Sequence, residues 1–216
     1  HAVEDRPSIS FNQGTWFGDV GLTQAGYNFE KNNVITHFGF KYSGITDLEF
    51  RNDSPSDSPL SYFSSFGLSF DAGKAFIRGN QRYGISISYV HFGIFTYESR
   101  GFGLNLGYSR DFLNKTKVGI VIQNVGKMSE LQTDDILLPQ RILLGCSKEF
   151  KFNQIKNSVY ISTEKNSLIS SAKIHVGNHF NWTRFNLYSG FSSSTGVMES
   201  SIGVGLLLSR FEVVYA

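Results

Sequence analysis

Residues 101–110 read GFGLNLGYSR, a strict alternation of large apolar residues with small or polar ones. Phe102, Leu104, Leu106 and Tyr108 fall on the even positions, and glycine, asparagine and serine fill the odd ones. Successive side chains of a β-strand point to opposite faces of the sheet. The stretch therefore predicts a strand with one apolar face and one small or polar face.

The same period of two recurs along the whole chain, and no stretch shows a convincing helical period. We predict an all-β protein of about thirteen strands, within a range of 12–14. The expected strands are 8–16, 18–29, 33–44, 61–73, 82–96, 100–112, 116–124, 139–150, 156–164, 170–179, 183–192, 197–208 and 210–216.

The connections between these strands alternate in length. Tight turns such as Asn114–Thr116 follow the even-numbered strands, whereas the long segments Glu49–Leu60 and Val125–Leu138 follow odd-numbered ones. In an up-and-down meander this places short turns at one end and long loops at the other. That asymmetry is typical of outer-membrane β-barrels. No linker or biased segment divides the chain, so we predict one β-barrel domain over residues 1–216.

Composition separates a membrane barrel from a soluble sheet. The non-apolar face consists mainly of glycine, serine and asparagine, whereas a water-exposed face would carry more charged residues. The expected strands are long enough for a tilted membrane span, and aromatic residues such as Trp16, Tyr97 and Trp182 lie near strand ends. We therefore predict an antiparallel, up-and-down transmembrane β-barrel. A soluble β-sandwich, either an adhesin or a structural protein, is the alternative.

The sequence offers no set of residues that argues for catalysis. The twenty Lys and Arg nearly balance the eighteen Asp and Glu, which disfavours a nucleic-acid partner. His175 and His179 would share a strand face but have no fixed third metal ligand. The single cysteine, Cys146, shares a face with Ile142 and Leu144 and reads as a small apolar residue. We predict no enzyme activity, no cofactor and no metal.

Several short motifs resemble the PorV/PorQ family of FadL-like outer-membrane barrels. The longest is VGIVIQNVGKMSELQTDDILLPQRILLGCSKEF at 118–150, a strand ending in Asn-Val-Gly, then a loop and a strand opened by Leu-Pro. The preceding strand at 101–108, the HVG at 175–177 followed by NLYSGF at 186–191, and the closing segments 203–205 and 214–216 are also similar, as is Trp16 with Asp19. Val214 stands where the family commonly has an acidic residue.

The resemblance implies a bacterial outer-membrane location and a non-enzymatic role in type IX protein secretion or surface attachment of cargo. Its partners would be outer-membrane lipid and secreted cargo or other secretion-system proteins. The family's N-terminal plug segment is absent from this sequence. Its usual fourteen strands imply an irregular closing strand or a further strand beyond this chain.

The two long loops are the expected partner-binding surface. We predict contacts at Arg51, Asp53 and Asp57 in the first loop and at Asp134 and Asp135 in the second. A FadL-like transporter of hydrophobic small molecules is the alternative function. It is disfavoured by the missing plug and by an inner face of Gly, Ser and Asn, although Val121, Leu143 and Leu207 add apolar side chains to that face.

Overall fold

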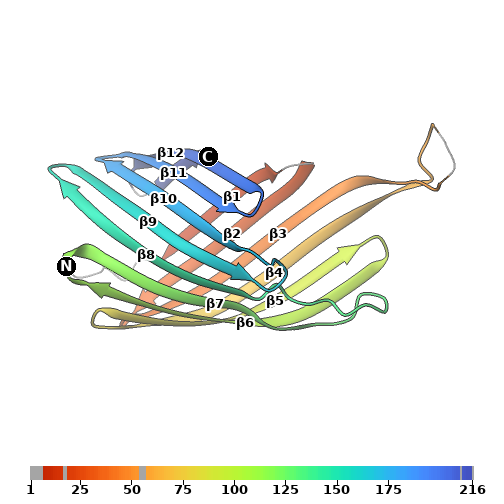
Figure 1. Ribbon diagram of the computed structural model, residues 1–216, viewed down its shortest axis with the longest axis horizontal. Coiled ribbons are helices and arrows are strands. Elements are labelled where there is room, and N and C mark those ends of the chain that lie inside the picture. The colour runs from red at the N-terminus through yellow and green to blue at the C-terminus, as the bar shows by residue number, and fades with distance from the viewer. Residues whose placement is uncertain (1–6, 17–18, 54–56, 210, 216) are drawn as a thin grey trace. The chain divides into compact units, whose positions relative to one another are not determined.

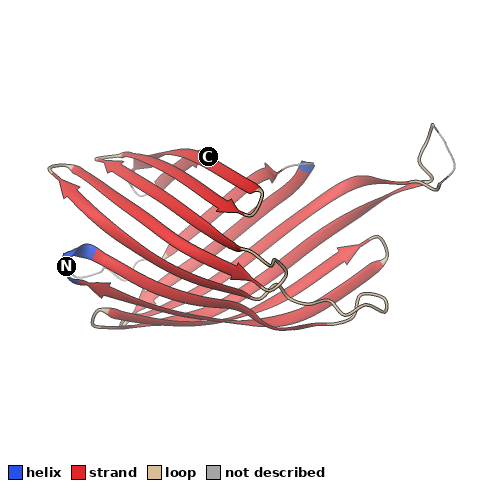
Figure 2. Cartoon of the chain, in the orientation of Figure 1, coloured by secondary structure: helices blue, strands red, loops and turns tan. Residues whose placement is uncertain are grey.

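A computed structural model describes residues 7–16, 19–53, 57–209 and 211–215 of the chain. The described residues include thirteen strands and the short 3-10 turn η2 (Leu113–Lys115), shown in Figures 1 and 2. The strands are β1 (Ser8–Trp16), β2 (Val20–Lys31), β3 (Val34–Phe50), β4 (Ser61–Arg78), β5 (Gln81–Ile94), β6 (Tyr97–Phe112), β7 (Thr116–Met128), β8 (Arg141–Phe152), β9 (Ile155–Asn166), β10 (Ala172–Trp182), β11 (Phe185–Ser194), β12 (Val197–Leu208) and β13 (Phe211–Tyr215).

The strands form one antiparallel sheet in which the spatial order is the order of the sequence. This confirms the all-β, up-and-down prediction and the expected number of strands. Within the described residues the hydrogen-bonded order runs from β1 to β13 without joining these two strands, so closure into a barrel stays a prediction. Residue 18 and residues 210 and 216, which belong to two predicted strands, lie outside the described residues.

The lengths of the connections follow the prediction in part, because the odd-numbered β5 and β11 are also followed by two-residue turns. Two- or three-residue turns end β2, β4, β6, β8 and β10, whereas longer loops of 51–60, 129–140 and 167–171 end β3, β7 and β9. We call these two ends of the strands the turn end and the loop end. Both long loops are shorter than predicted, because β3 continues to Phe50 and β7 to Met128.

Two compact units divide the described chain. Unit 1 comprises residues up to 76 together with 84–105 and 124–138, and unit 2 comprises 77–83, 106–123 and the residues from 139 onward.

The strand register sorts side chains onto two faces that differ in chemistry. In unit 2, Leu144 pairs with Thr163, and Cys146 pairs with Val118 and Ile161, on what we call the apolar face. Ser162 pairs with His175, which pairs with Ser192, on what we call the polar face. Unit 1 shows the same division into two faces. Phe40 pairs with Phe70 on the apolar face, and Gly39 pairs with Asp71 on the polar face.

In this sheet the buried side chains are mainly polar, and the large apolar side chains are mainly exposed. Among the described residues Leu138 is the one buried apolar side chain, whereas Ser88, Ser99, Glu164, Asn186 and Ser192 are buried polar ones. Large side chains of the apolar face stay open to the surroundings, with Leu144 50% and Ile161 52% exposed. The apolar face therefore has no protein layer against it within the described structure.

None of the helical segments in the described part of the chain has the length and apolar character that crossing a membrane would require.

Candidate functional site

The first predicted contact surface is the loop between β3 and β4. Arg51, Asp53 and Asp57 all lie on it and are all exposed. A hydrogen bond from Nε of Arg51 to Oε2 of Glu49, 2.7 Å long, raises the pKa of the guanidinium above its usual value. The loop closes where the amide of Leu60 donates to the carbonyl of Phe50, 2.9 Å away. The sequence and length of this loop can therefore change without breaking the pairing of β3 with β4.

The second predicted contact surface is the loop between β7 and β8. Asp134 and Asp135 are exposed, and Asp134 closes a tight turn through paired backbone hydrogen bonds with Leu131. The structure thus places the five predicted residues on two separate loops. Both loops follow odd-numbered strands and lie at the loop end.

The β7–β8 loop is anchored at both of its ends. At its start, the hydroxyl of the fully buried Ser99 donates to the carbonyl of Ser129, and the Ser129 amide donates to the carbonyl of Arg100. Near its end, Leu138 is 5% exposed and packs where Gly103 leaves room. The exposed carboxylates of Asp134 and Asp135 are therefore presented from a fixed base.

The polar face of unit 1 carries a hydrogen-bonded chain of side chains. Ser88 donates to Asp71, and the amide of Asn105 donates to Oγ of Ser88 over 2.8 Å and to Oγ of Ser86 over 3.1 Å. Oδ1 of Asn105 accepts from the backbone N–H of Asn124, 2.8 Å away. This chain joins β4, β5, β6 and β7 on one face.

The polar face of unit 2 carries an ionic row near the loop end. Arg141 in β8 makes a two-pronged contact with Glu164 in β9, with both N···O distances 2.7 Å. Nε2 of His175 in β10 lies 3.3 Å from the same carboxylate. Two parallel hydrogen bonds of this kind fix the carboxylate in place.

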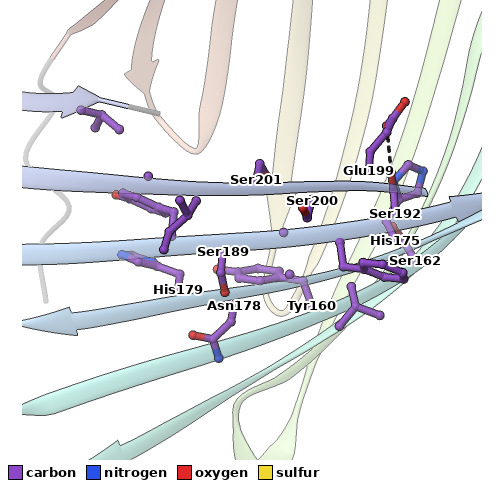
Figure 3. Close-up of a pocket in the computed structure, with 18 residues that line it drawn as sticks. Tyr160, Ser162, His175, Asn178, His179, Ser189, Ser192, Glu199, Ser200 and Ser201 are labelled. Atoms are coloured by element: carbon purple, nitrogen blue, oxygen red, sulfur yellow. Dashed lines mark hydrogen bonds between the residues drawn. The ribbon is translucent and has the colours of Figure 1, made fainter. Parts of the chain in front are cut away.

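The row continues across β10, β11 and β12. Lys173 lies 2.6 Å from Oε2 of Glu199, and the hydroxyl of Ser192 donates to the same oxygen over 2.9 Å. Figure 3 shows the hydrogen bond between Ser192 and Glu199 as a dashed line. We call Arg141, Glu164, His175, Lys173, Ser192 and Glu199 the charged row.

A hollow of about 660 Å³ opens on the polar face beside the charged row. Gly177 and Gly190 are register partners there, and the absence of side chains at both positions leaves the space. Tyr160 and His179 line it (Figure 3). The ring of His179 stacks on that of Tyr188, with the ring centroids 4.5 Å apart. Ser162, Ser192 and Ser201 also line it, together with apolar residues such as Val214 and Phe191.

A second polar cluster lies toward the turn end of the same unit. Asn186, which is buried, accepts from Asn181 over 2.6 Å and donates to Glu212 over 2.6 Å. Tyr188 donates to the same oxygen of Glu212 over 2.7 Å, and Nε2 of His179 lies 3.0 Å from Asn186. The side chains around the hollow are thus held by partners on neighbouring strands.

The lining of the hollow is mainly apolar, with a few hydroxyl and imidazole groups that can form hydrogen bonds. His175 and His179 share the polar face, as predicted, but they contact different partners. No three His, Cys, Asp or Glu side chains of the described residues gather as a metal ion would require. Cys146 lies exposed on the apolar face with Leu144, as its position in the alternation predicts.

The charged row was not predicted from the sequence. Its members are spread over residues 141–199 and meet only through the register of five neighbouring strands. Nothing in the period of two fixes that register, so no motif marked these residues in advance.

No family model matches the chain, and no curated protein matches it. The likeness to the PorV/PorQ family therefore depends on the short motifs alone.

Proposed function

We propose that this chain is a transmembrane β-barrel of a bacterial outer membrane, and that it binds proteins through its long loops. The observation that carries the proposal is the exposed apolar face beside a polar face of hydrogen-bonded side chains. In lipid, apolar side chains face outward and the backbone must be satisfied by neighbouring strands. A soluble sheet would instead cover its apolar face.

The strand lengths support the same proposal. Strands β8 to β12 contain 10–12 residues each. A tilted strand needs about 9–11 residues to cross the hydrocarbon layer. Short turns at one end and longer loops at the other match the periplasmic and extracellular ends of such barrels.

The finer part of the proposal is a non-enzymatic role in type IX secretion or in surface attachment of cargo, as in the PorV/PorQ family that the motifs resemble. The exposed carboxylates of Asp53, Asp57, Asp134 and Asp135 at the loop end support protein binding there. The anchored base of the β7–β8 loop supports it further, because a fixed surface loses less entropy on binding.

Transport of a hydrophobic solute fits the polar face less well. An acyl chain moving along that face in unit 2 would pass the charged row, where Glu164 is 8% exposed and bonded to Arg141. It would gain no hydrogen bonds in exchange for the water it displaced. We therefore favour protein binding at the loops.

Electrophoresis tests the barrel. The chain is refolded into zwitterionic phosphatidylcholine vesicles and run on SDS gels with and without boiling. A faster-migrating unboiled band is the expected result, because a closed barrel resists SDS until heated. An unshifted band, together with solubility in buffer without detergent, would refute the barrel and favour the soluble sandwich.

Loop replacement tests the finer role. Residues 52–59 are replaced by a two-residue Asn-Gly turn, and the surface retention of secreted proteins is measured in the bacterial host. We expect retention to be lost while the heat-dependent gel shift persists. The matched control replaces the β9–β10 loop, residues 168–170, and retains surface attachment. Retention that survives replacement of residues 52–59 and of 130–137 would contradict binding through these loops.

A further inference from the structure

Positive charge concentrates at the turn end of unit 2. Residues 78–82, 110–117 and 148–156, which surround the turns after β4, β6 and β8, carry eight Lys and Arg but only two carboxylates. This leaves twelve Lys and Arg against sixteen Asp and Glu in all other parts of the chain. We call these three segments the basic rim.

Contacts between neighbouring turns hold the basic rim together as one surface. The backbone amide of Asp111 donates to the carbonyl of Asn80 over 2.7 Å, and the side-chain amide of Asn80 donates to the carbonyl of Asp111 over 3.0 Å. Arg82 lies 2.8 Å from Asp111, and Lys115 lies 2.8 Å from Glu149. The two carboxylates of the rim are thus occupied by cations of neighbouring strands.

Two cations of the basic rim, Arg110 and Lys148, lie on the apolar face of the sheet. Arg110 follows Tyr108 on that face, with its guanidinium 5.1 Å from the ring centre of Phe112. Lys148 follows Cys146, with its ammonium 5.4 Å from the ring centre of Phe150. Both are exposed, and neither has a carboxylate within 4 Å among the described residues. Phe112 and Phe150 are themselves about half exposed.

We propose that the basic rim binds the phosphate headgroups of anionic phospholipids, with Arg110 and Lys148 making the contacts from the lipid-facing side. This inference rests on the proposed barrel. A cation above an aromatic ring at the edge of an apolar face can keep its aliphatic stem among acyl chains while its charge reaches the headgroup layer. Basic residues next to a membrane attract anionic lipids.

The placement of the two cations favours lipid over a soluble acidic partner. A partner in water would meet cations on the turns themselves, such as Lys115 in the β6–β7 turn. It would have no access to cations that share the apolar face with Phe112 and Phe150. An anionic lipid satisfies both features, because its phosphate and its acyl chains are joined in one molecule.

Lipid binding is measured by native mass spectrometry of the full chain, refolded in detergent micelles. The probes are phosphatidylglycerol and phosphatidylcholine with identical acyl chains. The test variant is Arg110→Gln/Lys148→Gln. The matched control is Arg100→Gln/Lys127→Gln, which removes the same charge at the loop ends of β6 and β7.

We expect the unaltered chain to retain phosphatidylglycerol at least tenfold more tightly than phosphatidylcholine. Each charge removed from the rim should weaken this preference about fivefold, so the double variant should show a preference about 25-fold smaller than that of the unaltered chain. The control should keep it. Equal retention of both lipids by the unaltered chain, or an unchanged preference in the test variant, would overturn the proposal and leave the rim to an acidic soluble partner.

The gel shift in pure phosphatidylcholine separates this inference from the barrel itself. A heat-dependent shift with no preference for phosphatidylglycerol refutes headgroup binding alone. The absence of any shift refutes the barrel, and headgroup binding with it.

Discussion

The two faces of the sheet differ in how hydrophobicity relates to burial. On the apolar face, Leu144 and Ile161 are about half exposed, whereas on the polar face Glu164 and Ser192 are each 8% exposed. In water-soluble proteins the large apolar residues are the buried ones and charged residues are almost never buried unless paired. The polar face is therefore held together by hydrogen bonds between its own side chains, whereas the large side chains of the apolar face have no comparable cover within the described structure.

The largest expected effect comes from placing a charge on the apolar face. Leu144→Arg should lower the free energy of unfolding in lipid vesicles by about 2–4 kcal/mol, because arginine near the bilayer midplane is costly. Phe152→Arg, on the same strand and face but beside the turn, should cost about 1 kcal/mol or less. Urea titration in phosphatidylcholine vesicles measures both. Equal costs would show that depth in a bilayer does not govern this face.

A smaller effect is expected from enlarging the polar face where strands approach closely. A β-carbon on Gly101 would lie 2.3 Å from the carbonyl oxygen of Lys127 and 2.7 Å from Met128, so the backbone would have to move. On Gly107, six residues later on the same strand and face, it would lie 4.0 Å from Val121. Gly101→Ala should cost about 1–3 kcal/mol, and Gly107→Ala should be nearly neutral. The midpoints of urea unfolding compare them, and equal midpoints would contradict the close approach.

Next comes the loss of a carboxylate from the charged row. Glu164→Gln should destabilise the chain by about 1–2 kcal/mol, because the two-pronged contact with Arg141 is lost. The effect is smaller than for a fully buried ion pair because the Arg141 side chain is 38% exposed. The double variant Glu164→Gln/Arg141→Gln should recover part of the loss, since it leaves no unpaired charge. If the double variant loses the sum of the two single losses, the pair contributes no coupling.

The smallest effect is expected at the loop end. Arg51→Gln removes an ion pair in which both side chains are more than two-fifths exposed. Such pairs contribute between zero and about 1 kcal/mol, so the midpoint of thermal unfolding in vesicles should change by less than about 4 °C. A larger change would mean that the β3–β4 loop supports the sheet rather than projecting from it.

The period of two was sufficient to predict the number, order and direction of the strands, but it did not predict where the strands end. The predicted strand 33–44 stops early because a bulge between Ile45 and Leu48 shifts the alternation, and Asp47 adopts a φ of 60° there. Asn124, with a φ of 61°, lies inside β7 at the position where the predicted strand 116–124 ends. A bulge adds one residue to a strand, so the side chains beyond it switch to the opposite faces. In the sequence, this switch in the alternation looks like the end of the strand.

The polar contacts were beyond prediction for a different reason. Arg141 and Glu164 are 23 residues apart, and their contact follows from a register that only turn geometry and packing fix. The exposed positions of Arg51, Asp53, Asp57, Asp134 and Asp135 were predictable, because turn-forming residues surround them. Which partner they contact stays a prediction.

The neighbour-only order of the strands also bears on how the chain acquires its structure. Each strand pairs with the strand before it or after it, and turns of two or three residues close the pairs at the turn end. Closing a short loop costs little entropy, and contacts between sequence neighbours favour rapid folding. The sheet can therefore grow by successive addition of hairpins, and a hairpin inserted or deleted during evolution would alter its width without rerouting the rest of the chain.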